Sequence, residues 1–482
     1  MKNVRLLVLF LLVGGLLSCS QEVIVLNPPH VDKEEKRMTV SYDEFVSLVF
    51  ADAQKMSSDE ASHMLDGFLK TLPFSGRSDR PVSFRLKGTE YLSLNTSAGH
   101  TRSNSEDAIP LYHFEVAGEE SSGFAVVSGD GRCPGVVAYV PYGDADSLDN
   151  RDDAKMMMGL SELFVVAKVN KIQHLVDSLR DDVVRKVSLE YPDEEITEKY
   201  AINYVRSEKT IEGETFSREY PRSPVYEEPA TAVVYKEGPY TVTVWSQDNP
   251  YNGALPSVYR PNFGVNFPGN YPLGCGVVAA MQVLAYLKPS MTINGLKMDW
   301  DKMTEKAEIS GGGYSDELMM VTALGKHVFE GTKSVANIKT DGQYGPYDDK
   351  TIPIVESTST KVSEIYSFLN KYVTCGDFYE RFASDALLTA IRGKHVSIMG
   401  GTCPNKNTNH AWIIDGFAIC KKSTREILRQ NDLYFHANMG LEGGEYSGYY
   451  RVDPTIDISF ELKDYETTYS KDFWVISDIR PK

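Results

Sequence analysis

A helix that begins at a cysteine is the feature that most restricts how this chain can fold. Cys275 follows Gly274 and opens the run Gly276–Val283, whose alanines and valines predict a buried helix. The thiol then lies at the positive end of the helix dipole, which favours the thiolate. Far downstream, His410 precedes the apolar run Ala411–Ile414, which is typical of a β-strand. The sequence therefore predicts a helical part that carries a cysteine and a β part that carries a histidine.

His410 is the candidate partner of the Cys275 thiol. It follows the cysteine by about 135 residues, within the roughly 130–150 residues that separate nucleophile and base in papain-like enzymes. Attack by a cysteine on a carbonyl needs a second residue that takes up a proton and returns it. Taken singly, a cysteine is usually a small core residue, and a histidine before a strand is usually a hydrogen-bonded polar residue. Together the two residues predict a cysteine peptidase.

Length and charge limit the class of protein. With 482 residues the chain is long enough for two or more domains, and 42% hydrophobic and 24% charged residues are typical of a globular protein. The net charge of −17 and the lack of a basic cluster exclude nucleic acid as an expected partner.

The N-terminus has the features of a targeting segment. Lys2 and Arg5 precede the apolar run Leu6–Leu17, which is too short to span a membrane as a helix. The run ends in Leu-Leu-Ser-Cys at Cys19, which resembles a bacterial lipoprotein box. We expect residues 1–18 to be a signal peptide and Cys19 to carry a lipid that anchors the exported protein to the outer membrane or the cell surface. The alternative is an ordinary secretory signal with a chance cysteine.

Five further cysteines follow Cys19. No two of them form a CxxC pair, so we expect neither a zinc site nor any other metal, and nothing in the sequence implies an organic cofactor. An exported protein can form disulfides, but an odd number leaves at least one thiol unpaired. The five residues are Cys133, Cys275, Cys375, Cys403 and Cys420.

The chain divides into segments of different pattern. Residues 19–40 are polar and predict a tether, residues 41–190 predict a domain of helices and strands, and residues 191–239 lack periodicity and predict an exposed linker. Residues 240–482 form the second domain. In the first domain we expect helices over 42–55 and 58–71, each after a capping box, strands at Pro110–Val116, Gly123–Val127 and Val136–Val140, and a long helix from Leu160 to about Val187.

Gln247 is a candidate for stabilising negative charge. It lies in the segment Trp245–Asn252, about 28 residues before Cys275. Its side-chain amide can donate to the oxyanion that forms when a thiolate adds to a carbonyl, together with the backbone N–H of Cys275.

Asn438 is the candidate that orients the histidine. It lies at the end of a predicted strand that begins near Tyr434 and leads into a glycine turn. Its side chain could accept a hydrogen bond from the His410 ring and so fix the tautomer. His436 is a rival base, but it lies within the predicted strand rather than at its start.

These segments together resemble the streptopain family of papain-like cysteine peptidases. The similar pieces cover residues 240–482 in the family's order. The region of about residues 40–190, which contains GFAVVSGDGRCPGVVAY (123–139), more weakly resembles the family's inhibitory propeptide. The resemblance implies an α+β papain-like fold preceded by an α+β propeptide domain, and a secreted cysteine endopeptidase made as a zymogen. It implies Cys275 as nucleophile, His410 as base and acid, Gln247 as oxyanion donor and Asn438 as orienting residue. The pieces are WSQDNPYN (245–252), Gly-Cys before an Ala-rich helix, NHAWIIDG (409–416), HANMGLEGG (436–444), YSGYYRVD (446–453) and DIRP (478–481).

Two departures from the family pattern affect what we expect. Family members carry tryptophan where this chain has Met439 and Leu441, so His410 would be less shielded from water here. Met439 and Gly440 are candidates for the substrate pocket.

The partners implied are protein or peptide substrates, the chain's own propeptide as an intramolecular inhibitor, and the membrane through the lipid. Two other classes stay open: an acyltransferase or transglutaminase-like enzyme with the same Cys-His pair, and a binding homologue with weakened catalysis.

Overall fold

The computed structural model describes eleven stretches of the chain. They are residues 37–72, 83–94, 108–118, 122–150, 152–208, 232–262, 265–338, 354–403, 408–420, 432–454 and 471–482. The predicted signal peptide, Cys19 and most of the tether lie outside them. Within the described part the fold is mixed, with eight α-helices and an antiparallel sheet of eleven strands.

Two capped helices begin the N-terminal part, as predicted. Helix α1 spans Tyr42–Val49 and helix α2 spans Ser58–Thr71, and both begin with a complete capping box, made by Ser41 with Glu44 and by Ser57 with Glu60. The predicted extension of the first helix to residue 55 is wrong. The chain leaves the helix at Phe50 because Lys55 and Met56 pair with the backbone beside Asp130.

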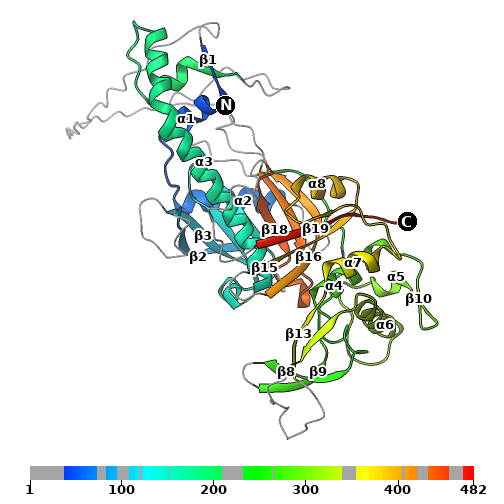
Figure 1. The fold of residues 1–482 in the computed structure, drawn as a ribbon. Coiled ribbons are helices and arrows are strands. Elements are labelled where there is room, and N and C mark those ends of the chain that lie inside the picture. Colours follow the sequence, from blue (N-terminus) through cyan, green and yellow to red (C-terminus); the bar gives the residue numbers. More distant parts are fainter. Residues whose placement is uncertain are drawn as a thin grey trace, which may run out of the picture.

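The predicted long helix is confirmed and is longer than expected. Helix α3 spans Asp152–Glu190. Its added first turns bury Met156, Met157 and Met158 against the sheet, which keeps them helical. Its far end packs against α1, where Val183 and Val187 share a cluster with Phe45 and Leu48. As Figure 1 shows, α3 thus connects the main body with a separate group of elements around α1.

The main sheet runs through both predicted domains. Strands β3, β4 and β5 confirm the three strands predicted in the N-terminal part, and β2 was missed. The order is β14-β19-β15-β16-β17-β18-β5-β4-β3-β2, with β7 paired to β16. The bounds are β2 Ser83–Leu92, β3 Ile109–Ala117, β4 Ser122–Ser128, β5 Gly135–Val140, β7 Val233–Glu237, β14 Phe378–Tyr379, β15 Val396–Cys403, β16 Thr408–Cys420, β17 Asp432–Asn438, β18 Gly448–Val452 and β19 Lys471–Ile479.

The junction between the two parts is the pairing of β5 with β18. Tyr139 lies opposite Tyr449, and Ala138 lies opposite Tyr450. A single hydrophobic cluster also contains Phe164 of α3 and Trp412 of β16. The sequence suggested two domains, but their strands share one sheet and part of one core.

Side chains alternate between the two faces of the sheet. In β16, Trp412 and Ile414 belong to the cluster that contains α3, whereas Ala411 and Ile413 belong to the cluster that contains the helices after residue 274. Those helices are α4 Cys275–Leu287, α5 Trp300–Met303, α6 Asp316–Gly331 and α7 Val362–Leu369, and they lie together in Figure 1; α8 Ser384–Arg392 packs with the α3 cluster.

Shorter elements complete the fold. Pairs of short strands form four two-stranded sheets besides the main one. They are β1 Met38–Val40 with β6 Val205–Ser207, β8 Ser257–Asn262 with β9 Val265–Asn270, β10 Thr292–Ile293 with β11 Leu296–Lys297, and β12 Val335–Ile338 with β13 Val355–Ser359; three 3-10 helices lie at Ala145–Asn150, Ala201–Tyr204 and Glu442–Gly444.

The predicted linker is more ordered at its two ends than its sequence suggested. Residues 205–207 form β6, which pairs in parallel with β1, and residues 233–237 form β7 in the main sheet. Residues 209–231 lie outside the described part. The tether prediction is likewise too long, because residues 38–40 form β1.

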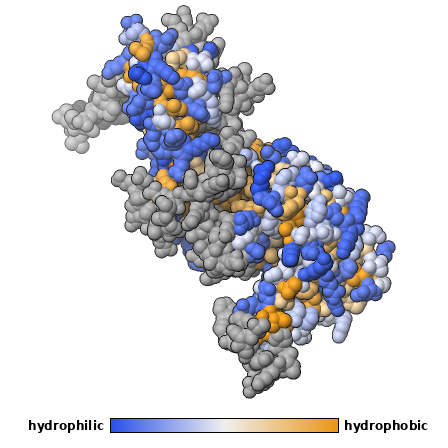
Figure 2. Space-filling model, viewed as in Figure 1, coloured by the Kyte–Doolittle hydropathy of each residue, from blue (hydrophilic) through white to orange (hydrophobic). Residues whose placement is uncertain are grey.

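The described part of the face seen in Figure 2 is mainly polar. In Figure 2 hydrophilic residues cover most of the described part of the visible face, with apolar residues in small groups. Among the helices of the described ranges, none has both the length and the apolar character needed to cross a membrane.

Candidate active site

The turn before Cys275 gives the thiol its place at a helix end. Gly274 is the N-cap of α4 and has φ 88°, a conformation that favours glycine. A Cβ on Gly274 would come within 3.1 Å of Thr358 in β13. The Thr358 hydroxyl also donates to the carbonyl of Pro272 at 2.6 Å, which holds the turn against β13. Cys275 is therefore the first helical residue, and its side chain is only half-buried.

The structure brings His410 to this thiol. His410 is the third residue of β16 and lies opposite Gly401 of β15. The Sγ of Cys275 is 4.0 Å from the carbonyl oxygen of Asn409, the residue before the histidine. The helix and the strand that the sequence singled out thus meet at the predicted pair.

The surroundings of Cys275 favour its thiolate. Burial raises the pKa of the thiol, but His410, through its charge and a side-chain hydrogen bond, and the backbone N–H groups of Ala411 and Gly276 lower it, so that the pKa of Cys275 lies below its ordinary value. By contrast, burial raises the pKa of the Cys375 thiol to about 12. Reactivity is therefore expected at Cys275 and not at Cys375.

The His410 ring is sheltered and held from one side. Its Nε2 lies 3.2 Å from the carbonyl oxygen of Met439. A carbonyl can only accept, so Nε2 carries a proton and Nδ1 is left to take the proton of the thiol. The ring stacks on Trp412 with centroids 5.9 Å apart, and His410 is only 5% exposed. Trp412 thus supplies an indole beside the histidine from the same strand, and the comparison with the family's shielding stays a prediction.

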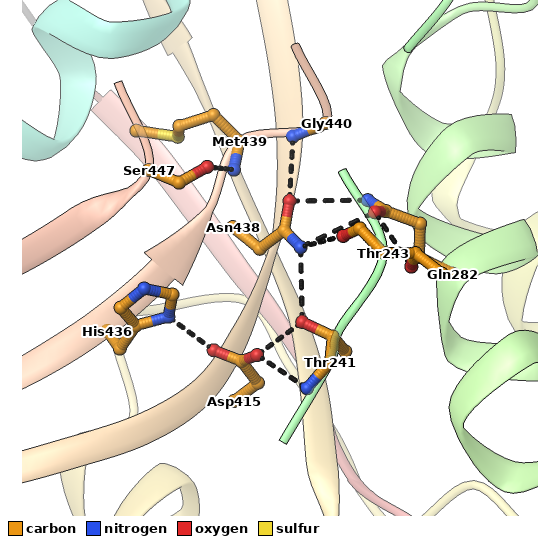
Figure 3. A network of polar contacts seen from close by, with 9 residues as sticks. All are labelled: Thr241, Thr243, Gln282, Asp415, His436, Asn438, Met439, Gly440 and Ser447. Atoms are coloured by element: carbon orange, nitrogen blue, oxygen red, sulfur yellow. Dashed lines mark hydrogen bonds and ion pairs between the residues drawn. The ribbon is translucent and has the colours of Figure 1, made fainter. Parts of the chain in front are cut away.

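The contact with the His410 ring that the sequence predicted for Asn438 is made by the next residue, Met439. We expected the Asn438 side chain to accept from His410, but the ring contact is made by the Met439 carbonyl. The Asn438 oxygen instead accepts from the backbone N–H of Gly440 at 3.1 Å and from Gln282 Nε2 at 3.3 Å. The physical reason is that Asn438 is 3% exposed and points to α4, where other buried amides and hydroxyls need partners (Figure 3).

The rival base His436 has a different partner. Its Nδ1 lies 2.6 Å from an oxygen of Asp415, whose other oxygen accepts from the backbone N–H of Thr241 at 2.9 Å and from the Thr241 hydroxyl. Figure 3 shows this pair on the side of Thr241 that faces away from Gln282. His436 therefore belongs to a hydrogen-bond network with Asp415 and Thr241 rather than to the thiol.

Gln247 lies on the loop that adjoins the Cys275 turn. Its backbone carbonyl accepts from the N–H of Leu273 at 2.9 Å, two residues before the cysteine. Gln247 is half-buried, so its side chain can reach solvent or a substrate. This backbone bond holds the two loops together, and the oxyanion role remains a prediction.

Met439 and Gly440 do not line an open pocket in this structure. Met439 is 0% exposed and packs in the cluster that contains α3. Gly440 is buried as well, and a Cβ there would come within 3.0 Å of Val278. Both residues face the interior here, and a role in substrate binding stays a prediction.

Gln282 is a buried residue that sequence reasoning did not single out as part of the site. It is 0% exposed and bonds to Asn438, to the Thr243 hydroxyl and to the backbone N–H of Trp245. The signal in the sequence is one amide within the otherwise apolar run of α4. Among the described residues, no group of three or more His, Cys, Asp or Glu side chains could hold a metal ion.

Comparison with known proteins agrees with this geometry. Residues 245–450 match the Peptidase C10 family. A search of curated proteins finds no match to the chain. The matched range contains Gln247, Cys275 and His410. Residues 245–450 are therefore similar to the Peptidase C10 family, the streptopain family, and the chain is a cysteine-type peptidase, a hydrolase.

Proposed function

We propose that the chain is an endopeptidase in which Cys275 is the nucleophile and His410 transfers the proton. The observation that carries this proposal is that Cys275, the first residue of α4, meets the start of β16 at His410, with Sγ 4.0 Å from the Asn409 carbonyl oxygen. In line with this geometry, His410 and two backbone N–H groups lower the pKa of the thiol although burial raises it. A thiolate is the reactive form of cysteine, and it needs an adjacent imidazolium as its counterion and acid. The half-buried position of Cys275 leaves the sulfur accessible to a substrate.

The chemistry follows from these two groups. The thiolate adds to the carbonyl carbon of the scissile bond, and the electron pair of the C=O bond moves to oxygen. As the C–N bond breaks, the His410 imidazolium gives its proton to the departing amine. His410 then takes a proton from water, the resulting hydroxide adds to the thioester, and the C–S bond breaks to regenerate Cys275. The Met439 carbonyl supports this role because it holds Nε2 and leaves Nδ1 to the thiol.

The negative charge on the carbonyl oxygen needs donors. We assign this role to the Gln247 side chain and the backbone N–H of Cys275. Its support is the bond from Leu273 N–H to the Gln247 carbonyl, which keeps the glutamine loop beside the helix end. The first N–H groups of α4 have no partner within the helix and add a positive field at the same place.

Residues 41–190 act as an inhibitory propeptide domain on a papain-like domain formed by residues 240–482. Several contacts between the two parts support this role. The buried Tyr434 hydroxyl donates to the carbonyl of Val136 at 2.7 Å, and Lys168 lies 2.8 Å from Asp453. Such contacts, with the β5–β18 pairing, hold the N-terminal part on the peptidase part until the chain is cut.

Activation is cleavage between Ser207 and Val233. The bonds Val205–Arg206 and Tyr235–Lys236, each an apolar residue followed by a basic one, both lie in strands, β6 and β7. The sequence between these strands is rich in charged residues and prolines and lacks periodicity, which supports cleavage in this segment. N-terminal sequencing of the active form should therefore begin between residues 208 and 233.

We further propose that the chain is exported and anchored by a lipid. Residues 1–18 act as a lipoprotein signal peptide and Cys19 carries the lipid, so the zymogen is held at the outer membrane or cell surface. Cleavage between Ser207 and Val233 would then release the peptidase part from the lipid. The support is the N-terminal sequence alone, and incorporation of labelled fatty acid that is lost in Cys19→Ala tests it.

Labelling of the thiol tests the catalytic assignment. We would treat the chain with an epoxide that alkylates papain-type thiolates and measure casein hydrolysis in parallel. Wild type should be labelled at Cys275 and should digest casein, whereas Cys275→Ala and His410→Ala should not digest it. Cys375→Ala is the matched control, because this buried thiol has a raised pKa and its removal should leave both labelling and hydrolysis intact. Substantial turnover by Cys275→Ala would disprove the proposed mechanism.

A further inference from the structure

Gln282 is a polar residue in the middle of an apolar helix. Every other residue of α4 from Val277 to Leu284 is apolar, and Gln282 itself is 0% exposed. Burying an amide is unfavourable unless its donors and acceptor find partners. The role of Gln282 therefore depends on the groups to which its amide is hydrogen-bonded.

The oxygen of Gln282 holds the segment that leads to Gln247. Its Oε1 accepts from the Thr243 hydroxyl at 3.1 Å and from the backbone N–H of Trp245 at 3.2 Å. Trp245 stands two residues before Gln247. Helix α4, which carries Cys275, is thus hydrogen-bonded directly to the segment that carries Gln247, the candidate oxyanion donor.

The nitrogen of Gln282 holds the turn that contacts His410. Its Nε2 donates to Asn438 Oδ1 at 3.3 Å, and Asn438 Nδ2 lies 3.4 Å from Gln282 Oε1, so the two amides pair (Figure 3). Asn438 Oδ1 also accepts from Gly440 N–H at 3.1 Å. Between these two residues lies Met439, whose carbonyl meets the His410 ring.

From these contacts we infer that Gln282 is a positioning residue: one buried amide fixes the Cys275 helix, the Gln247 segment and the turn behind His410 relative to one another. Seven residues of helix, about 10 Å, separate Gln282 from Cys275, and a helix transmits position rigidly over such a length. The inference rests on the proposed function, because it concerns the geometry of the same three groups.

A purely structural role would have a different signature. If Gln282 only stabilises the fold, its loss lowers the melting temperature and leaves the remaining folded molecules as active as wild type. If it positions the site, its loss changes the distance between thiol and imidazole. The thiol then loses part of the charge stabilisation that His410 provides, and turnover falls while substrate affinity changes little.

The test compares three variants of the full chain. Gln282→Met removes every polar contact at nearly constant volume, and Gln282→Glu keeps the acceptor for Thr243 and Trp245. Val283→Ala is the matched control, because it loosens the same helix at a 0% exposed site without touching the amides. The first readout is the rate of Cys275 alkylation by iodoacetamide against pH, measured by mass spectrometry of the Cys275 peptide; the second is kcat and KM of the processed enzyme.

We expect the alkylation profile of Gln282→Met to shift to higher pH and its kcat to fall about ten- to a hundredfold, as for a small misplacement of reacting groups. KM should stay within about twofold, since the contacts with substrate are not removed. Gln282→Glu should recover part of the loss, and Val283→Ala should lower the melting temperature without shifting the alkylation profile. If Gln282→Met fails to fold, Thr243→Val removes one contact only and should shift the profile in the same direction.

Two outcomes separate this inference from the proposed function. If wild type alkylates at Cys275 like an ordinary thiol and cleaves no peptide, the proposed function fails. If wild type is active and Gln282→Met matches it in kcat and in the alkylation profile, only the positioning role of Gln282 is overturned. The same holds if Val283→Ala shifts the profile as far as Gln282→Met does.

Discussion

The ion pair between Lys168 and Asp453 gives a quantitative test of how the two parts of the chain are held together. Lys168 lies on α3 and Asp453 follows β18; the charged atoms are 2.8 Å apart, and the side chains are 15% and 14% exposed. Burial lowers the pKa of Lys168, but Asp453 and other nearby groups outweigh burial and raise it, so the lysine stays charged. Asp453→Asn would remove this carboxylate from beside a largely buried ammonium.

The expected loss in the free energy of unfolding lies between two limits. Exposed pairs contribute about 1 kcal/mol or less, whereas removing one partner of a fully buried pair costs about 3–5 kcal/mol. For side chains that are about one-seventh exposed we expect a loss of about 2 kcal/mol, or about a 30-fold change in the unfolding equilibrium. A matched control lies on the same helix: Arg185 and Asp182 are 2.7 Å apart but 71% and 63% exposed. Asp182→Asn should change stability by less than about 0.5 kcal/mol.

Urea unfolding provides the assay. The Cys275→Ala background prevents self-cleavage, and all four tryptophans of the chain lie at or after residue 245, so their fluorescence reports on the peptidase part. Circular dichroism at the helix band reports in addition on α3. Asp453→Asn should unfold at lower urea by both probes, and Lys168→Met combined with Asp453→Leu should recover most of the loss. An unchanged urea midpoint for Asp453→Asn would refute the view that this pair stabilises the joined state.

Three further predictions concern the site itself. Gln247→Ala should lower kcat by about a hundredfold or more with little change in KM, as expected for the loss of one oxyanion donor. Steady-state kinetics on one peptide substrate measure both constants. Unaltered turnover would assign the role to another donor. Met439→Trp should destabilise the protein by about 1–3 kcal/mol because the side chain is 0% exposed and the larger ring overpacks the core; a melting temperature equal to that of wild type would contradict this. Because the pKa of Cys275 is lowered, its alkylation should persist as the pH falls below the ordinary thiol range, whereas Cys375, with a pKa raised to about 12, should stay unlabelled in the same digest.

Features that depend on neighbouring residues could be predicted from the sequence. The two capping boxes at Ser41 and Ser57 require only residues three positions apart, and both form. The start of α4 at Cys275 follows from Gly274 and the apolar run after it. The pair of Cys275 and His410 could be predicted as well, because few chemistries need both residues in these settings.

Side-chain contacts and strand pairings between residues far apart in the sequence could not be predicted in the same way. The sequence shows that Asn438 stands near the histidine, but not whether its amide or the neighbouring Met439 carbonyl turns to the ring. The choice depends on what else is buried nearby, here Gln282 and Thr243. The pairing of β5 with β18 was missed for the same reason, since alternation within a strand does not identify the strand beside it.

The joined sheet has a consequence for how this protein is made. Arg451 of β18 donates to the carbonyl of Pro134 just before β5, across a sequence separation of 317 residues. During synthesis β2 to β5 leave the ribosome long before their neighbour β18 exists, so β5 waits as an open edge with unpaired backbone groups. Contacts at such separation form slowly, because a very long loop must close first. Chains that end before residue 448 should therefore aggregate, because the edge of β5 stays open until β18, Gly448–Val452, has been made.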